Sequence, residues 1–164
     1  QAVKQDVRKG DLQVALNAEV RRQVASELQP VLADLLDLSL QGKQAHWNIV
    51  GPFFPAIHAQ LDTVVEDART WSDTVAERIV ALDVPAQGQV RDVMEGSSLP
   101  PLPKEMIRDR DTVRLVTERL AAAAARAHQA ADRLGERDTV SQDILLEVAQ
   151  GLEKHLWMFR AQLA

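Results

Sequence analysis

The chain has 164 residues, a formal net charge of −5 and no cysteine or tyrosine, and 46% of its residues are hydrophobic. This length suits one domain with a core of its own, and the absence of cysteine excludes disulfides and thiolate metal sites and fits a reducing cytosol. No run of about 20 uncharged apolar residues occurs, so no membrane-spanning helix is expected. The negative charge argues against a nucleic-acid surface on the body of the protein.

The chain opens with a polar segment and continues with a helical pattern. Residues 1–11 are polar and aperiodic, and we interpret them as an N-terminal arm before one helical domain over residues 12–164. From Leu12 to His46 apolar residues recur at three- and four-residue steps, which predicts a long helix. Pro30 should kink this helix or start a new one, and Gly51-Pro52 should end it.

Three further helices and one long connection follow. The second helix should begin at Pro55 and run to Leu82, because proline suits the first turn of a helix. The segment Val84–Pro103 is far longer than neighbouring antiparallel helices need, and it contains a short amphipathic piece, Val90–Glu95. Two more helices are predicted, over about Lys104–Leu134 and Thr139–Gln162. The prediction is an all-α, ferritin-like four-helix bundle with a long crossover carrying a short helix between the second and third helices.

The second helix carries four ligand-type side chains on one narrow stripe, namely His58, Asp62, Asp73 and Glu77. They cannot bind one metal ion within one helix. Asp62 and Asp73 are eleven residues apart, about 16 Å along the axis. Metal ligands lie only about 2.0–2.2 Å from the ion that they bind.

Antiparallel pairing of this helix with its own copy removes the difficulty. The pair His58 and Glu77 and the pair Asp62 and Asp73 share one midpoint, between positions 67 and 68. A two-fold axis there sets His58 opposite the partner's Glu77 and Asp62 opposite the partner's Asp73. Such a contact repeats itself, so two identical sites form per dimer.

One more ligand and one ion pair complete this hypothesis. His46, just before the Gly51-Pro52 turn, can fold back and add a second imidazole. Nitrogen and oxygen ligands without sulfur suit iron, manganese or zinc. The same symmetry predicts that Glu66 meets the partner's Arg69 twice per dimer.

Several local motifs resemble one family of proteins, the Dps miniferritins, which are DNA-binding proteins of starved cells. The resemblance extends from about Leu28 to Phe159. It rests on AHW at positions 45–47, GPFF at 51–54, HAQLD at 58–62, DTVAER at 73–78 and the Leu156-Trp157 pair.

This resemblance implies a ferroxidase. It implies a dodecamer around a small cavity, in which ferrous iron is oxidised, preferably by hydrogen peroxide, between two-fold-related subunits. The iron is then stored as ferric mineral, which protects DNA from oxidative damage. Two iron sites are implied at each dimer interface, with Trp47 beside the iron. The implied ligands are His46, His58 and Asp62 of one subunit with Asp73 and Glu77 of its mate.

The resemblance also implies two less specific sites. Asp143 and Glu147, with Glu153 as a weaker candidate, would belong to an acidic pore through which iron enters, although Asp143 and Glu147 could simply favour the dipole of the last helix. DNA binding would depend on Lys4, Arg8 and Lys9 in the arm. The alternative is a solvated arm that helps assembly.

Other roles are open for several residues and for the protein as a whole. His128 and His155 are interpreted as structural, and Trp47 as packing rather than chemistry. A nucleoid-compacting DNA-binding protein with a vestigial iron site, and a helical oligomer with only structural metal, are the alternatives. No Glu-x-x-His motif of classical ferritins occurs, which favours the shared site. We therefore expect a cytoplasmic, nucleoid-associated iron-oxidising protein.

Overall fold

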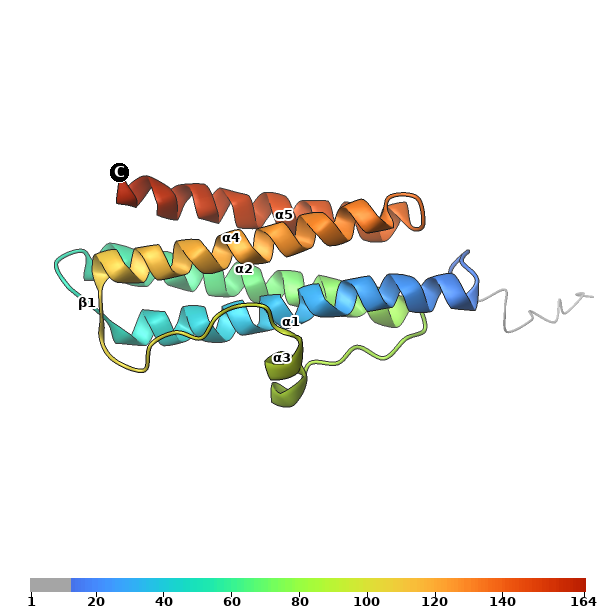
Figure 1. Cartoon of the computed structure of the whole chain (residues 1–164), viewed down its shortest axis with the longest axis horizontal. Helices are drawn as coiled ribbons and strands as arrows, with labels where there is room; N and C mark the ends of the chain where they lie inside the picture. The colour runs from blue at the N-terminus through green and yellow to red at the C-terminus, as the bar shows by residue number, and fades with distance from the viewer. Residues whose placement is uncertain (1–12) are drawn as a thin grey trace, which may run out of the picture.

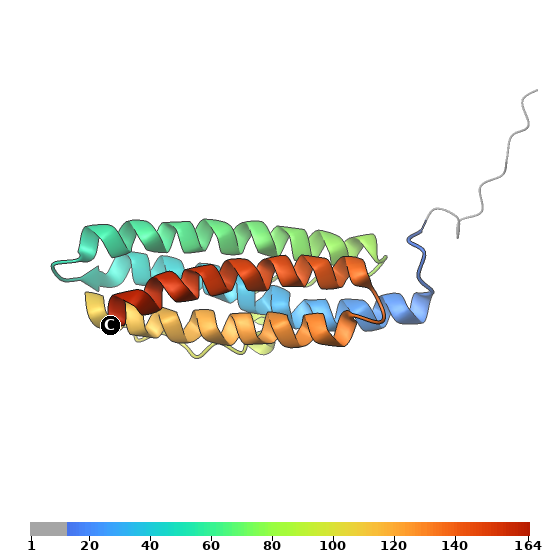
Figure 2. The ribbon, with the colours of Figure 1, turned by 90° about the horizontal axis from the view of Figure 1, so that it is seen from above.

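The computed structural model describes residues 13–164, which form four long helices lying side by side (Figures 1 and 2). The first antiparallel pair is α1 (Ala18–Asn48) with α2 (Phe54–Ala81), and the second is α4 (Asp109–Leu134) with α5 (Thr139–Arg160). A 3₁₀ turn, η2 (Ala161–Leu163), follows α5. The predicted all-α ferritin-like bundle is confirmed. Lys4, Arg8, Lys9 and the boundary between arm and bundle lie outside the described residues.

The predicted crossover connects the two helix pairs. It leaves the end of α2, forms the short helix α3 (Val90–Gly96), and returns along the bundle to the start of α4 (Figure 1). Just before α4, the strand β2 (Ile107–Arg108) pairs in parallel with β1 (Ile49–Val50). This pairing ties the turn between α1 and α2 to the start of α4.

The core runs the length of the bundle between the helix pairs. Leucine, valine and alanine dominate it, as the helical periodicity predicts. Its largest fully buried side chains come from all four long helices and include Leu28, Leu35, Leu61, Ile79, Leu120, Leu134, Leu145, Leu152 and Phe159.

The predicted starts of two helices are wrong. α1 begins at Ala18, not Leu12, because the Asn17 side chain accepts the Val20 N–H at 2.9 Å and caps the helix there. α1 continues through Pro30, which excludes the start of a new helix there, because buried residues on both sides of the proline pack into the core. α4 begins at Asp109 rather than about Lys104, because the preceding residues form β2.

Buried polar groups fasten the crossover to the bundle. The Arg119 guanidinium donates to the carbonyl oxygens of Pro100 and Pro101 at 2.9 and 2.8 Å. The Asp34 carboxylate accepts from the Ser98 backbone N–H at 2.7 Å and from the Arg126 guanidinium at 2.9 Å. These bonds satisfy backbone groups of a long irregular segment.

No helix among residues 13–164 is both long and apolar enough to cross a membrane.

Candidate metal centre

The turn between α1 and α2 brings His46 and His58 together. It requires Gly51, whose φ of +131° is one that other residues rarely adopt. A Cβ at Gly51 would lie 2.5 Å from the Asp109 carboxylate, which accepts the Phe53 N–H at 2.9 Å. The conformation of this turn therefore depends on contacts with the start of α4 as well as on its own sequence.

The two imidazoles stack and hold each other in position. Their ring centroids are 3.5 Å apart with an angle of 19° between the planes. The Nδ1 of His46 lies 2.8 Å from the His58 carbonyl oxygen, and the Nδ1 of His58 lies 2.8 Å from the His46 carbonyl oxygen. A carbonyl can only accept, so each Nδ1 carries the hydrogen and Nε2 is the ring nitrogen left for a metal ion. Imidazoles in this tautomer are prepared to bind a metal ion through Nε2.

Asp62 lies one helical turn after His58, and its carboxylate lies beside the paired imidazoles in what we call the His46 cluster (His46, His58 and Asp62). One of its carboxylate oxygens lies 3.3 Å from His46 Nδ1 and 2.5 Å from the Lys43 ammonium. The hydrogen bond from Lys43 holds the pKa of Asp62 below its ordinary value, so this carboxylate is ionised at neutral pH. A cation bound by Asp62 would therefore have to compete with the Lys43 ammonium for this carboxylate.

Asp73 and Glu77 lie farther along α2, toward its C-terminal end, and both are exposed. Asp73 lies on the rim of a groove of about 310 Å³, which we call the α1–α2 groove. Among residues 13–164 of one chain, no three histidine, aspartate or glutamate side chains gather closely enough to hold a metal ion. Within the described part of one chain the structure thus places Asp62 beside the paired imidazoles without forming a complete metal site, and it leaves Asp73 and Glu77 apart from them.

Two contacts of this cluster were not predicted from the sequence. Lys43 lies one turn before His46, and that spacing could have indicated a cation beside the cluster. Phe54 stacks on His58, with ring centroids 4.7 Å apart. The expectation that Trp47 packs is wrong within its own chain, because 66% of this residue is exposed.

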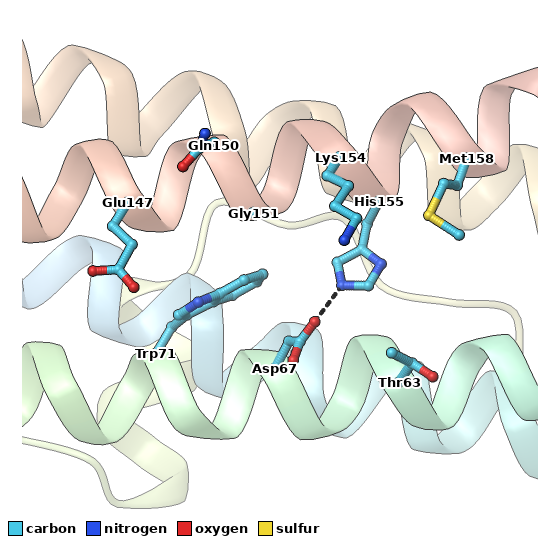
Figure 3. A pocket seen from close by; sticks show the side chains of 9 residues that line it. All are labelled: Thr63, Asp67, Trp71, Glu147, Gln150, Gly151, Lys154, His155 and Met158. Atoms are coloured by element: carbon cyan, nitrogen blue, oxygen red, sulfur yellow. Dashed lines mark hydrogen bonds and ion pairs between the residues drawn. The ribbon is translucent and has the colours of Figure 1, made fainter.

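A second groove, of about 600 Å³, lies between α2 and α5 (Figure 3). His155 is buried there, and its Nε2 lies 2.7 Å from the Asp67 carboxylate. The edge of its ring contacts Trp71, with centroids 6.0 Å apart. Trp71 in turn needs Gly151, where an added Cβ would lie 2.1 Å from the indole. His155 thus has the packing role that we expected.

The acidic candidates of α5 lie in different surroundings. Asp143 is exposed near the start of the helix, and Glu147 lies in the groove of Figure 3. Glu153 lies 2.7 Å from His128 of α4. The sequence suggested no acidic partner for His128, because the two residues are far apart in the chain and meet only across the α4–α5 contact.

The chain is similar to ferritin-like proteins over almost its whole length. The family model described as a ferritin-like domain matches residues 25–164. The DNA protection during starvation protein of Agrobacterium fabrum is 33% identical over 147 residues, which cover 89% of this chain and 91% of that protein.

Solved structures agree with this assignment. Dps from Microbacterium arborescens, described in a high iron form, is 38% identical and superimposes with a TM-score of 0.86, covering 91% of this chain and 99% of that one. Dps from Mycobacterium smegmatis is 31% identical with a TM-score of 0.87, covering 91% of this chain and 90% of the other. The chain therefore belongs to the Dps family of ferritin-like proteins.

Proposed function

We propose that the protein is a ferroxidase whose iron site is shared between two subunits. His46, His58 and Asp62 of one subunit would bind iron together with Asp73 and Glu77 of the partner subunit. The observation that carries this proposal is the prepared pair of imidazoles beside Asp62, with the other two carboxylates on the same stripe of one unbroken helix. Membership in the Dps family supports iron storage and DNA protection as the general role.

The chemistry of the residues suits ferrous iron as substrate. Two imidazoles and three carboxylates form a nitrogen and oxygen ligand set without sulfur, which accommodates iron. Three carboxylates neutralise the added charge when the ion becomes ferric. With two ferrous ions held about 3.5–4 Å apart, each would give one electron to hydrogen peroxide, which is reduced to water without releasing a radical.

We further propose that the product is stored as ferric mineral inside a dodecameric shell in the cytoplasm, and that removing iron and peroxide protects DNA. The proposed two-fold contact pairs Glu66 with the partner's Arg69. Asp143 and Glu147 are proposed as part of an iron entrance. Binding of DNA through Lys4, Arg8 and Lys9 of the arm is proposed as a separate property of residues outside the bundle.

Complementation between two inactive variants tests the shared site. One variant carries His46→Ala and Asp62→Ala, and the other carries Asp73→Ala and Glu77→Ala. Each variant alone has only broken sites. In a mixed dimer, one of the two sites receives every intact ligand, so co-expression in equal amounts should restore about a quarter of the sites.

The measurement is ferric absorbance after anaerobic addition of ferrous iron and then one peroxide for every two irons, with radical trapping in parallel. Restored, radical-free oxidation in the co-expressed sample supports the shared site. If the mixture stays as inactive as the two separate variants, the ligands do not come from two chains. Slow oxidation in the wild type as well would mean that the protein is not a ferroxidase.

A further inference from the structure

One buried carboxylate at the start of α4 holds the turn between α1 and α2. Asp109 is the first residue of α4 and is only 7% exposed. One of its oxygens accepts the backbone N–H of Phe53 at 2.9 Å, and the other accepts the backbone N–H of Arg110 at 2.8 Å. The carboxylate therefore joins the backbone of the turn to the backbone of its own helix.

Phe53 is the residue at which α2 begins, and the sequence of α2 provides no cap there. Phe53 forms no side-chain cap hydrogen bond, and the first turn of α2 contains no acidic residue. The N–H groups at the start of a helix have no acceptor within it, and a negative charge beside them is favourable. Asp109 thus supplies from α4 both the acceptor and the charge that the start of α2 lacks.

Gly51 allows the carboxylate to lie against the turn. A Cβ at Gly51 would lie between 2.5 and 2.9 Å from three atoms of the Asp109 carboxylate. The carbonyl oxygen of Gly51 accepts the Phe54 N–H at 3.1 Å. Just before Gly51, the pairing of β1 with β2 brings the same two segments side by side (Figure 1). The segment before α4 therefore holds the turn on both sides of Gly51.

The turn in turn determines how the two imidazoles meet. Phe54 stacks on His58, one helical turn later, with ring centroids 4.7 Å apart. The Nδ1 of His58 lies 2.8 Å from the His46 carbonyl oxygen, and the reverse contact has the same length. Both bonds require one fixed separation between the end of α1 and the first two turns of α2. A turn that moved away from α4 would change that separation.

We propose that Asp109 is a positioning residue for the His46 cluster. By holding the start of α2 against α4, it keeps both imidazoles in the tautomer that leaves Nε2 for a metal ion. Asp109 acts through the backbone of the turn, and none of the five proposed ligands comes from α4. The metal-binding part of this inference rests on the iron site proposed above. The site thus depends on the second helix pair, although its ligands come from the first.

The tautomers of His46 and His58 in the metal-free protein provide the first test. Solid-state NMR of protein with isotope-labelled histidine shows which ring nitrogen carries the hydrogen. Asp109→Ala should change the Nδ1–H form into a mixture with the Nε2–H form. Asp111→Ala is the matched control, because Asp111 is an exposed acidic residue in the same first turn of α4, and it should leave the tautomers unchanged. A substitution that only lowers stability would not alter the tautomers of the folded protein.

Cobalt binding provides the second test. Asp109→Ala should weaken the affinity for cobalt by about tenfold, as expected when a group that orients metal ligands is lost. Asp111→Ala should bind cobalt as tightly as wild type. If Asp109→Ala fails to fold, Asp109→Asn replaces it, because the amide has nearly the same shape but only one acceptor oxygen. Asp109→Asn should change the tautomers and the affinity in the same direction, by a smaller amount.

Two outcomes separate this inference from the proposed function. Unchanged tautomers and unchanged cobalt affinity in the folded Asp109 variants would overturn the positioning role, even if the wild type oxidises iron rapidly. Slow oxidation of iron by the wild type would reject the ferroxidase. The tautomers of the metal-free protein would still decide whether Asp109 positions the imidazoles, because that measurement does not depend on iron.

Discussion

Charged side chains have opposite surroundings along the crossover and on the face formed by α1 and α2. Along the crossover, charged side chains are buried and bonded within the chain: Asp34 is 1% exposed and accepts from Ser98 and Arg126. On the α1–α2 face, Asp73 and Glu77 are exposed and bond to no other side chain among residues 13–164. An exposed tryptophan lies on the same face.

This difference separates groups that stabilise one subunit from groups left for something outside it. A buried polar group without a partner destabilises the fold, so the buried polar groups at the crossover have hydrogen-bond partners within the chain. Exposed carboxylates at helical spacing cost little in a single chain and remain available to a cation. Removing a charge should therefore affect folding in the first region and iron binding in the second.

Asp34→Ala should produce the largest loss of stability. It leaves the Arg126 guanidinium and the Ser98 N–H without their acceptor, and removing one member of a buried pair costs about 3 kcal/mol or more. Glu19→Ala is the control, because its pair with Arg22 is fully exposed and contributes little to stability. Urea unfolding at one fixed protein concentration measures both, and equal losses would mean that Asp34 does not fasten the crossover.

Asp138→Asn should cost about 1–2 kcal/mol, because Asp138 caps α5 and pairs with Arg78 at 2.7 Å. Burial raises the pKa of Asp138, but hydrogen bonds from Ser141 and Arg78 outweigh it, and the pKa lies below the ordinary 3.8. A lowered carboxyl pKa stabilises the fold above the unfolded pKa, and this contribution disappears as the pH falls through the folded pKa.

The difference in free energy of unfolding between wild type and Asp138→Asn should therefore be constant near neutral pH and shrink below pH 3.8. Thermal unfolding of both proteins over an acid pH series measures it. A difference that persists unchanged into strong acid would assign the stabilisation to something other than the Asp138 charge.

Lys43→Met should tighten binding of a divalent cation by up to about tenfold, because the ammonium no longer competes for Asp62. The pKa of Asp62 should return toward its ordinary value. Titration with cobalt, which peroxide-free buffer leaves divalent, measures the affinity, and Lys154→Met in the α2–α5 groove is the control. Weaker binding in Lys43→Met would show instead that the lysine positions Asp62.

Asp73→Asn combined with Glu77→Gln should change the stability of the metal-free protein least, by about 0.5 kcal/mol or less, because both residues are exposed. The melting temperatures of wild type and the double variant should differ only when metal is added, because metal binding raises the melting temperature of wild type alone. A large loss of stability without metal would mean that these carboxylates already have structural partners in the assembly.

Periodicity and Gly/Pro punctuation predict the helices and the crossover well, because both signals are local. The predicted start of α1 is wrong because the nearby Asn17 caps the helix after the apolar pattern has already begun. The predicted start of α4 is wrong for a physical reason that lies elsewhere in the chain. α4 starts late because Ile107 and Arg108 pair with Ile49 and Val50. No local pattern around Lys104 reveals that partner.

The candidate site also has features that the local sequence predicts and features that it does not. Spacing along α2 places Asp62, Asp73 and Glu77 on one stripe, and the Gly51-Pro52 turn explains why His46 returns to His58. The reciprocal bonds of the two imidazoles use backbone carbonyls, which residue types do not reveal.

The paired imidazoles have a consequence for how mutants of this site are interpreted. Each ring is oriented by the backbone carbonyl of the residue that carries the other, so His46→Ala removes a ligand and the ring stacking but keeps the carbonyl that accepts from His58 Nδ1. The losses of metal affinity in the two single histidine variants should therefore nearly add up to the loss in the double variant. A loss in the double variant far below this sum would show that the stacked rings, and not the backbone, keep each other in place.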